Sequence, residues 1–180
     1  MMRKIKGFLE GWCEIQSDVL IDNRGCFIKT VHEEWYREMG VPFSYAEEYC
    51  STSQKGVLRG LHFQLPPKEH SKLVYCSAGK ILDVAVDLRK SSPTYGQYQM
   101  VELSGEKGNM VFIPKGFAHG FYTLSDVATI VCKQSNVFDA QADSGIRWDS
   151  VGIPWPAQNP ILSDKDKKHV RLEDFISPFI

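Results

Sequence analysis

Apolar and polar residues alternate along short stretches of this chain, with the two-residue period of β-strands. Residues 81–88 predict a strand with two distinct faces: Leu82, Val84, Val86 and Leu88 on one, and Ile81, Asp83, Ala85 and Asp87 on the other. Turn signals separate further predicted strands over residues 12–16, 26–31, 45–51, 97–103, 110–113, 117–124 and 127–136. Many short strands favour an all-β fold, and a cupin-type jelly-roll barrel with a few short helices would hold one small ligand in its mouth.

Signals for helices are few. Residues His32–Met39 are the best helix candidate, ended by Gly40 and then Pro42. Residues Ser163–Asp166 have the composition of a helix start. From Gly145 onward the chain is rich in proline and tryptophan, so this part is predicted to be largely irregular.

The stretch Lys55–Val74 carries the most suggestive chemistry. It predicts two strands joined by a Pro-Pro turn, with Arg59, His62 and Lys72 set among apolar neighbours. A guanidinium suits a phosphate, a neutral imidazole can accept a proton, and an ammonium can stabilise an oxyanion, so a small anionic substrate would suit all three. Arg59 and His62 would point to opposite faces of a flat strand, but a bulge at Gly60 would turn both toward one cavity.

Composition and charge narrow the classes of function. The 180 residues are 24% charged and 43% hydrophobic and lack repeats or linker-like shifts, so a single domain over residues 1–180 is expected. The net charge of −1 argues against a general nucleic-acid or anionic-membrane surface. No apolar run approaches the roughly 20 residues of a membrane span, and no signal peptide is expected. Five scattered cysteines without a C-x-x-C pair fit a reducing cytoplasm.

A metal site of the kind common in such barrels is not predicted. His62 is followed by Phe63-Gln64, so a His-x-His pair is missing, and His70 lies in a proline-rich turn. No glutamate follows at a matching place on a strand. We therefore expect a site that works without metal and without another cofactor.

Arg24 and His119 have two interpretations each. Arg24 follows Asn23 in a turn, where it is either a solvated loop charge or an anion ligand. His119 lies in a predicted strand, where it is either a hydrogen-bonded core histidine or a pocket residue. Each motif is weak on its own, and their combination carries more weight.

Taken together, the motifs resemble one known family. Eight segments stand in the family's order: Arg24-Gly25, Gly56 to Gln64, Lys72-Leu73-Val74, Asp83 to Arg89, Ser91 to Gly96, Ile113 to Phe121, Gly145 to Trp148 and Leu162 to Asp166. They are similar to those of the dTDP-4-dehydrorhamnose 3,5-epimerases. The resemblance implies a cupin-type jelly roll, usually a homodimer, that acts without metal on a nucleotide-linked 4-keto-6-deoxy sugar.

The resemblance also implies roles for individual residues. His62 matches the family's catalytic base, Asp166 matches its carboxylate partner, and Lys72 matches the lysine that faces the 4-keto oxygen. A positioned base of this kind contributes roughly 10²–10⁴-fold to the rate. Arg24 and Arg59 match residues that hold the diphosphate. The remaining expected substrate-binding residues are Phe27, Glu47, Tyr49, Gln64, His119, Phe138 and Lys168.

The chain departs from the family where a tyrosine usually returns a proton to the sugar from the opposite side. Cys132 stands at that place, directly before Lys133, and the family's later tyrosine pair reads Val137-Phe138. A thiol has a suitable pKa but a shorter reach than a phenol. Either Cys132 or a water beside it is the acid, or one of two epimerisation steps is lost. We favour inversion at C3, with C5 left open, and a merely structural Cys132 is the third alternative.

The expected nucleotide contacts differ as well. The chain has Glu47-Glu48-Tyr49 where the family often has Gln-Asp-Asn. A carboxylate such as that of Glu47 could accept hydrogen bonds from guanine, so GDP and CDP join dTDP as candidate carriers. Two rival functions stay open: a 3,4-ketoisomerase acting on the same substrate class, and a sugar-nucleotide binding module without activity.

Overall fold

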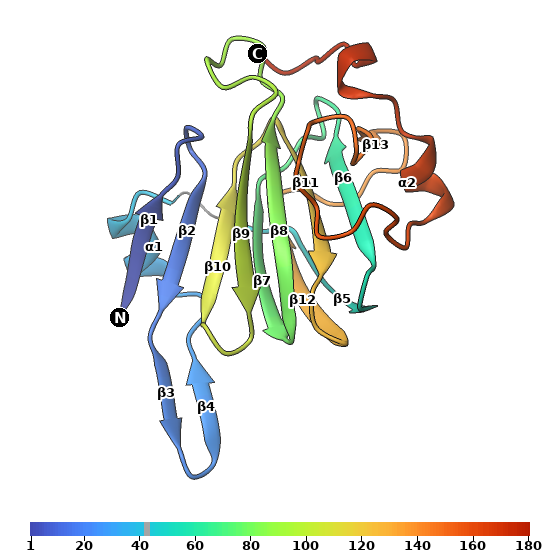
Figure 1. Ribbon diagram of the computed structural model, residues 1–180. Helices are drawn as coiled ribbons and strands as arrows, with labels where there is room; N and C mark the ends of the chain where they lie inside the picture. The colour runs from blue at the N-terminus through green and yellow to red at the C-terminus, as the bar shows by residue number, and fades with distance from the viewer. Residues whose placement is uncertain (42–43) are drawn as a thin grey trace.

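The computed structural model describes residues 1–41 and 44–180, and two antiparallel sheets form its body (Figure 1). One sheet has six strands, in the spatial order β1 (Met2–Lys6), β2 (Cys13–Ser17), β10 (Asn109–Ile113), β7 (Lys72–Ala78), β12 (Val127–Gln134) and β5 (Glu47–Gln54). The other has five, in the order β13 (Asp143–Gly145), β6 (Leu58–Gln64), β11 (Phe117–Thr123), β8 (Lys80–Asp87) and β9 (Tyr98–Ser104). The predicted all-β, cupin-type fold is confirmed.

The helices are short, as expected. They are α1 (Glu33–Glu38), α2 (Asp164–Lys168) and the 3-10 turn η1 (Leu172–Asp174). The predicted helix His32–Met39 is confirmed, with these two residues as its caps, whereas the predicted stop at Pro42 lies outside the described residues. Within the described ranges, no helix is both long and apolar enough to cross a membrane.

Both faces of β8 are buried, as its alternating pattern predicts. Ile81 and Ala85 lie in the core between the two sheets. Val84, Val86 and Leu88 lie in a second cluster on the opposite face. This second cluster is closed by the C-terminal part of the chain, which contributes Ile146, Ile153 and Phe179. The proline-rich segment that looked irregular therefore covers the outer face of the five-stranded sheet.

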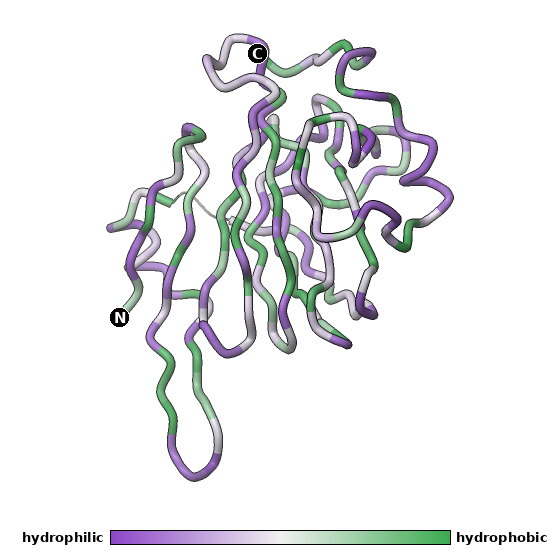
Figure 2. The backbone as a smooth tube through the Cα atoms, in the orientation of Figure 1, coloured by the Kyte–Doolittle hydropathy of each residue, from purple (hydrophilic) through white to green (hydrophobic). Residues whose placement is uncertain are grey.

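One hairpin projects from this body. Among the described residues, strands β3 (Val19–Asp22) and β4 (Gly25–Ile28) pair only with each other, and they extend beyond the sheets in Figure 1. Figure 2 shows that both strands are largely apolar. Leu20, Ile21 and Phe27 are each at least 60% exposed, which is unusual for large apolar side chains grouped on one element.

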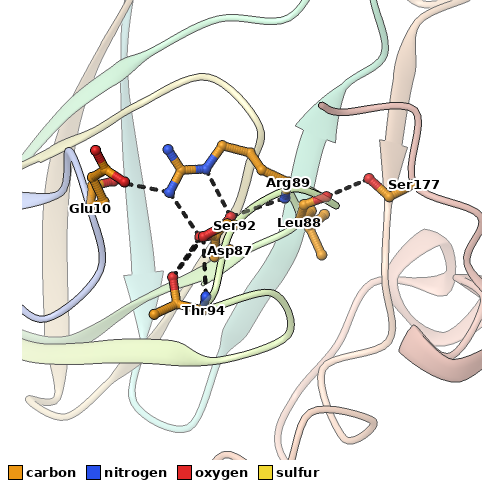
Figure 3. Close-up of polar contacts among 7 residues, drawn as sticks. All are labelled: Glu10, Asp87, Leu88, Arg89, Ser92, Thr94 and Ser177. Atoms are coloured by element: carbon orange, nitrogen blue, oxygen red, sulfur yellow. Dashed lines mark hydrogen bonds and ion pairs between the residues drawn. The ribbon is translucent and has the colours of Figure 1, made fainter.

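Residues of two family-like motifs, Asp83 to Arg89 and Ser91 to Gly96, form hydrogen bonds away from the cavity described below. The carboxylate of Asp87 accepts hydrogen bonds from Arg89, Ser92 and Thr94, at 2.6–3.0 Å (Figure 3). Ser177 hydrogen-bonds the carbonyl of Leu88 in the same view. These bonds fix the loop after β8 and tie the C-terminal segment to the sheet, so the motifs stabilise the fold.

Candidate active site

A cavity of about 680 Å³ opens between the two sheets. This volume is in the range of sites for small molecules. Side chains from both sheets and from α2 line it. The cavity gathers most of the titratable residues that the sequence singles out: Arg59, His62, Lys72, His119 and Asp166.

The bulge predicted at Gly60 is confirmed. His62 pairs with His119, whereas Arg59 pairs with Phe121, so β6 has one more residue than β11 between these two pairs. As a result, Arg59 and His62 both line the cavity. Gly60 has a φ of +142°, and a Cβ atom there would lie 2.6 Å from the Cα of Gly120. Only glycine fits at such a position, which explains why this motif contains it.

His62 and Asp166 form a hydrogen-bonded pair. His62 Nε2 lies 2.6 Å from Asp166 Oδ1, although 104 residues separate them in the chain. Asp166 is held on α2, where its backbone N–H donates to the Ser163 hydroxyl that caps the helix. Burial alone would raise the pKa of Asp166, but hydrogen bonds from His62 and from the N–H of Gly60 lower it below its ordinary value. The charged carboxylate thus orients the imidazole.

Lys72 places a positive charge beside this pair. Its side chain is only 5% exposed, and its Nζ donates to the main-chain carbonyl of His62 at 3.2 Å. Burial lowers the pKa of the Lys72 ammonium, because the low-dielectric surroundings disfavour its charge. A ligand oxygen that acquires negative charge would relieve this cost, so the position suits an oxyanion.

A second histidine–aspartate pair lies deeper. His119 Nε2 is 2.7 Å from Asp83 Oδ2, and both side chains are almost fully buried. Burial lowers the pKa of His119, with Asp83 opposing the shift, so the imidazole is neutral near pH 7. Sequence reasoning included His119 but gave Asp83 no role. The alternation in β8 was the available signal, because it places a carboxylate on the inner face.

Two further histidines near the site were missed, and one of them lines the cavity. His70 is 9% exposed and lines the cavity, and neither of its ring nitrogens has a hydrogen-bond partner among the described residues. His169 lies beside the His62–Asp166 pair, with its Nε2 3.7 Å from Asp166 Oδ1. Its place three residues after Asp166, at the C-cap of the short helix α2, was a signal for proximity.

His62, Asp166 and His169 are also a set that could hold a metal ion, because their ligand atoms lie within 4.8 Å of one another. However, ligands of a tetrahedral zinc ion at bond lengths of 2.0–2.2 Å are about 3.3 Å apart. The 2.6 Å between His62 and Asp166 is a hydrogen-bond distance instead. The arrangement therefore fits a proton between the two residues better than a metal, and metal-free action stays a prediction.

Several predicted substrate-binding residues line the cavity: Glu47, Tyr49, Gln64 and Phe138. Gln64 is already engaged, because its amide donates to two carbonyls and accepts from the N–H of Asp139 at 2.7 Å. Glu47 accepts a 2.8 Å hydrogen bond from the N–H of Phe138. These two side chains thus fix the loop that carries Phe138 at the mouth of the cavity.

Other predicted site residues lie apart from the cavity within a single chain. Arg24 and Phe27 are on the projecting hairpin, where Arg24 is exposed and pairs with Asp22. Lys168 is exposed on α2, and its neighbour Lys165 lines the cavity instead. Cys132 is fully buried in the core between the sheets and is not among the lining residues. The roles predicted for these four residues stay predictions.

Comparison with known proteins agrees with this geometry. The sequence pattern of the family described as dTDP-4-dehydrorhamnose 3,5-epimerase matches residues 6–174. A protein of that name from Shigella flexneri is 46% identical over 161 residues, which cover 86% of this chain and 89% of that protein. A dTDP-4-dehydrorhamnose 3-epimerase from Streptomyces niveus is 34% identical over 169 residues, covering 92% of this chain and 82% of the relative.

The similarity extends from the sequence to the fold of a solved structure. The epimerase of Legionella pneumophila in complex with dTDP-4-keto-L-rhamnose superposes with a TM-score of 0.92 and 37% identity, covering 98% of this chain and 95% of that one. Sequence pattern, relatives and fold agree over nearly the whole chain. The chain therefore belongs to the dTDP-4-dehydrorhamnose 3,5-epimerase family.

Proposed function

We propose that this protein epimerises a nucleotide-linked 4-keto-6-deoxy sugar at C3. The observation that carries the proposal is the His62–Asp166 pair, which opens into a cavity beside the buried ammonium of Lys72. A hydrogen on a carbon next to a ketone is acidic enough to be removed when a base is close and the resulting enolate is stabilised. The cavity supplies both requirements.

Each residue has a defined part in the first step. Because Nε2 of His62 bonds to Asp166, Nδ1 is the nitrogen that carries the free electron pair. Nδ1 takes the proton from C3, and the electrons of the C–H bond move to form the enolate, whose O4 faces the Lys72 ammonium. Asp166 stabilises the imidazolium that results. Protonation of C3 from the other side then gives the epimer.

Arg59 supports binding of the diphosphate. Its Nε donates to the hydroxyl of Ser53 at 2.9 Å, which orients the guanidinium at the wall of the cavity. A planar guanidinium binds phosphate oxygens in pairs more readily than an ammonium does. The Legionella pneumophila epimerase is bound to dTDP-4-keto-L-rhamnose, and an epimerase from Bacillus anthracis is bound to TDP and pyrophosphate. The carboxylate of Glu47 supports GDP or CDP as alternative carriers, and competition binding of dTDP, GDP and CDP distinguishes the three.

We also propose a homodimer. The exposed apolar side chains of the hairpin need a cover, and a second copy of the chain can provide it. Docking of this kind would bring Arg24 and Phe27 to the cavity of the partner, in keeping with the substrate-binding roles predicted for them. Light scattering coupled to size-exclusion chromatography should give a mass twice the 20.4 kDa of a single chain.

The five free cysteines support a reducing compartment such as the cytoplasm.

The central test follows solvent exchange by NMR in D2O with 4-keto-6-deoxy sugars linked to dTDP, GDP and CDP. The wild type should incorporate deuterium at C3, and His62→Asn should abolish incorporation while nucleotide binding stays nearly intact. Deuterium at both C3 and C5 with double inversion would make the enzyme a 3,5-epimerase. Movement of the ketone in the product would indicate a ketoisomerase, and binding without exchange by the wild type would indicate a binding module.

A further inference from the structure

Inversion at C3 requires a proton donor on the face of the sugar away from His62. The resemblance to the family implies a tyrosine donor at position 132, but this chain has a buried cysteine there. His62 belongs to β6 of the five-stranded sheet. The opposite wall of the cavity is the inner face of the six-stranded sheet, formed here by β5, β12 and β7. A donor must come from that wall.

The pairing of these strands identifies what lies on the wall. Tyr49 on β5 is directly opposite Cys132 on β12, and Cys132 is directly opposite Val74 on β7. Residues that are directly opposite in antiparallel strands share a face of the sheet. Two residues along, the next inward row contains Gln134 and Lys72. Tyr49 therefore lies on the inner face, one row from the ammonium that faces the ketone.

The side chains of Tyr49 and Cys132 differ in their access to the cavity. Tyr49 lines the cavity, whereas Cys132 is fully buried beneath it. Cys132 is the residue that pairs directly with Tyr49, and Gln134 lies two positions further along the same strand and also lines the cavity. At this pair of positions the tyrosine, and not the shorter cysteine, therefore reaches the cavity. Among the described lining residues, Tyr49 is the one tyrosine.

We propose that Tyr49 is the catalytic acid that protonates the enolate on the face opposite His62. This assignment rests on the epimerase function proposed above. In the step, the O–H bond of Tyr49 breaks, the electron pair of the enolate forms the new C3–H bond, and the C4 ketone is restored. The phenolate then takes a proton from solvent, and the His62 imidazolium returns its proton to solvent. Atoms and charges balance without a further reactant.

Other proton-bearing groups at the cavity fit this step less well. His119 is paired with Asp83 and lies directly opposite His62 across β11 and β6, so it belongs to the wall of the base. Lys72 is needed at the ketone oxygen. The phenol of Tyr49 carries its proton near neutral pH, because an unperturbed tyrosine has a pKa of about 10. Its side chain lines the cavity and is therefore within reach of a bound sugar.

The test separates deprotonation from inversion. In D2O, Tyr49→Phe should still incorporate deuterium at C3 through His62, but the label should appear in recovered substrate with retained configuration. Formation of the inverted product should fall about 10²–10⁴-fold, which is the usual contribution of a positioned acid. Tyr75→Phe is the matched control, because Tyr75 is on β7 of the same sheet but packs in the cluster on its outer face. It should leave both rates unchanged.

A second pair of variants shows whether a loss of inversion comes from the missing phenol or from a disturbed fold. Tyr49→Ala combined with Cys132→Tyr moves the phenol to the neighbouring strand and should restore part of the inversion that Tyr49→Ala alone loses. Wild-type inversion rates in Tyr49→Phe, or loss of inversion in Cys132→Ser, would overturn the assignment while leaving the epimerase function in place. Absence of exchange in the wild type with all three nucleotide sugars would overturn both.

Discussion

The two histidine–aspartate pairs of this protein have nearly the same length and different environments. His62 and Asp166 are 2.6 Å apart, and His119 and Asp83 are 2.7 Å apart. The His62 side chain is 31% exposed and faces the cavity, whereas that of His119 is 5% exposed. Their carboxylates also differ in origin, because Asp166 comes from a C-terminal helix and Asp83 from the adjacent strand.

The difference shows that a hydrogen-bonded pair is not by itself a catalytic base. A base must be reached by the carbon whose proton it removes, and it must carry a charge for part of the reaction. His62 is open to the cavity, and under the proposed function Asp166 stabilises its charged ring. At His119 burial disfavours the charged ring and lowers its pKa. The first pair is suited to catalysis, and the second to shaping the floor of the cavity.

The comparison is tested most strongly by the matched substitutions Asp166→Asn and Asp83→Asn. Asp166→Asn should lower the rate of C3 exchange about 10²–10⁴-fold, because the amide neither stabilises the imidazolium nor fixes the same tautomer. Asp83→Asn should affect exchange far less. Equal losses in the two variants, measured by NMR in D2O at fixed pH, would show that the pairs act together.

Asp83→Asn should instead lower the stability of the fold. It replaces a buried carboxylate by an amide, so the hydrogen bond to His119 weakens, at a cost of about 1–2 kcal/mol in the free energy of unfolding. Urea unfolding of Asp83→Asn and of the wild type measures this cost, and the Asp166→Asn variant is unfolded in the same way for comparison. A stability equal to that of the wild type would contradict a structural role for the second pair.

His70 is a buried histidine that, unlike His62 and His119, has no carboxylate hydrogen-bonded to its ring among the described residues. Burial lowers its pKa from 6.5 to about 3. Between these values the unfolded chain binds a proton that the folded chain does not, so the contribution of His70 to stability falls as the pH falls. His70→Gln should therefore make the melting temperature less dependent on pH between 7.5 and 5. His119 and His169 also have pKa values lowered from 6.5, so part of the dependence in this range should persist.

An unchanged pH dependence in His70→Gln would show that this histidine is not held neutral by the fold. The substitution preserves a polar side chain of similar length, which limits the change in packing. The same variant reports on the substrate, because a neutral ring with unpaired nitrogens is available to a ligand hydroxyl. Weaker binding of the nucleotide sugar, with C3 exchange at saturation unchanged, is the expected result.

Much of the fold could be predicted from local pattern. The alternation over residues 81–88 placed the apolar side chains on the two faces that the structure gives them. The helix-start composition at Ser163 marked the helix that carries Asp166. The hairpin strand β3 and the short β13 were missed, because β3 is largely exposed and β13 has only three residues.

The site was predictable only in its chemistry. The sequence determined that a guanidinium, an imidazole and an ammonium stand within 14 residues, and that a glycine could allow a bulge between the first two. The resemblance added Asp166. Which side chains share the cavity was decided by the tertiary structure, because strand pairing fixes the face to which each side chain points.

Tyr49 and Cys132 show this division most clearly. The sequence determined that position 132 holds a side chain too short to reach a sugar, and that a tyrosine lies 83 residues earlier. It did not determine that the two are directly opposite on neighbouring strands. Register between distant strands depends on contacts along their whole length, and only those contacts set the phenol over the cysteine at the wall facing His62.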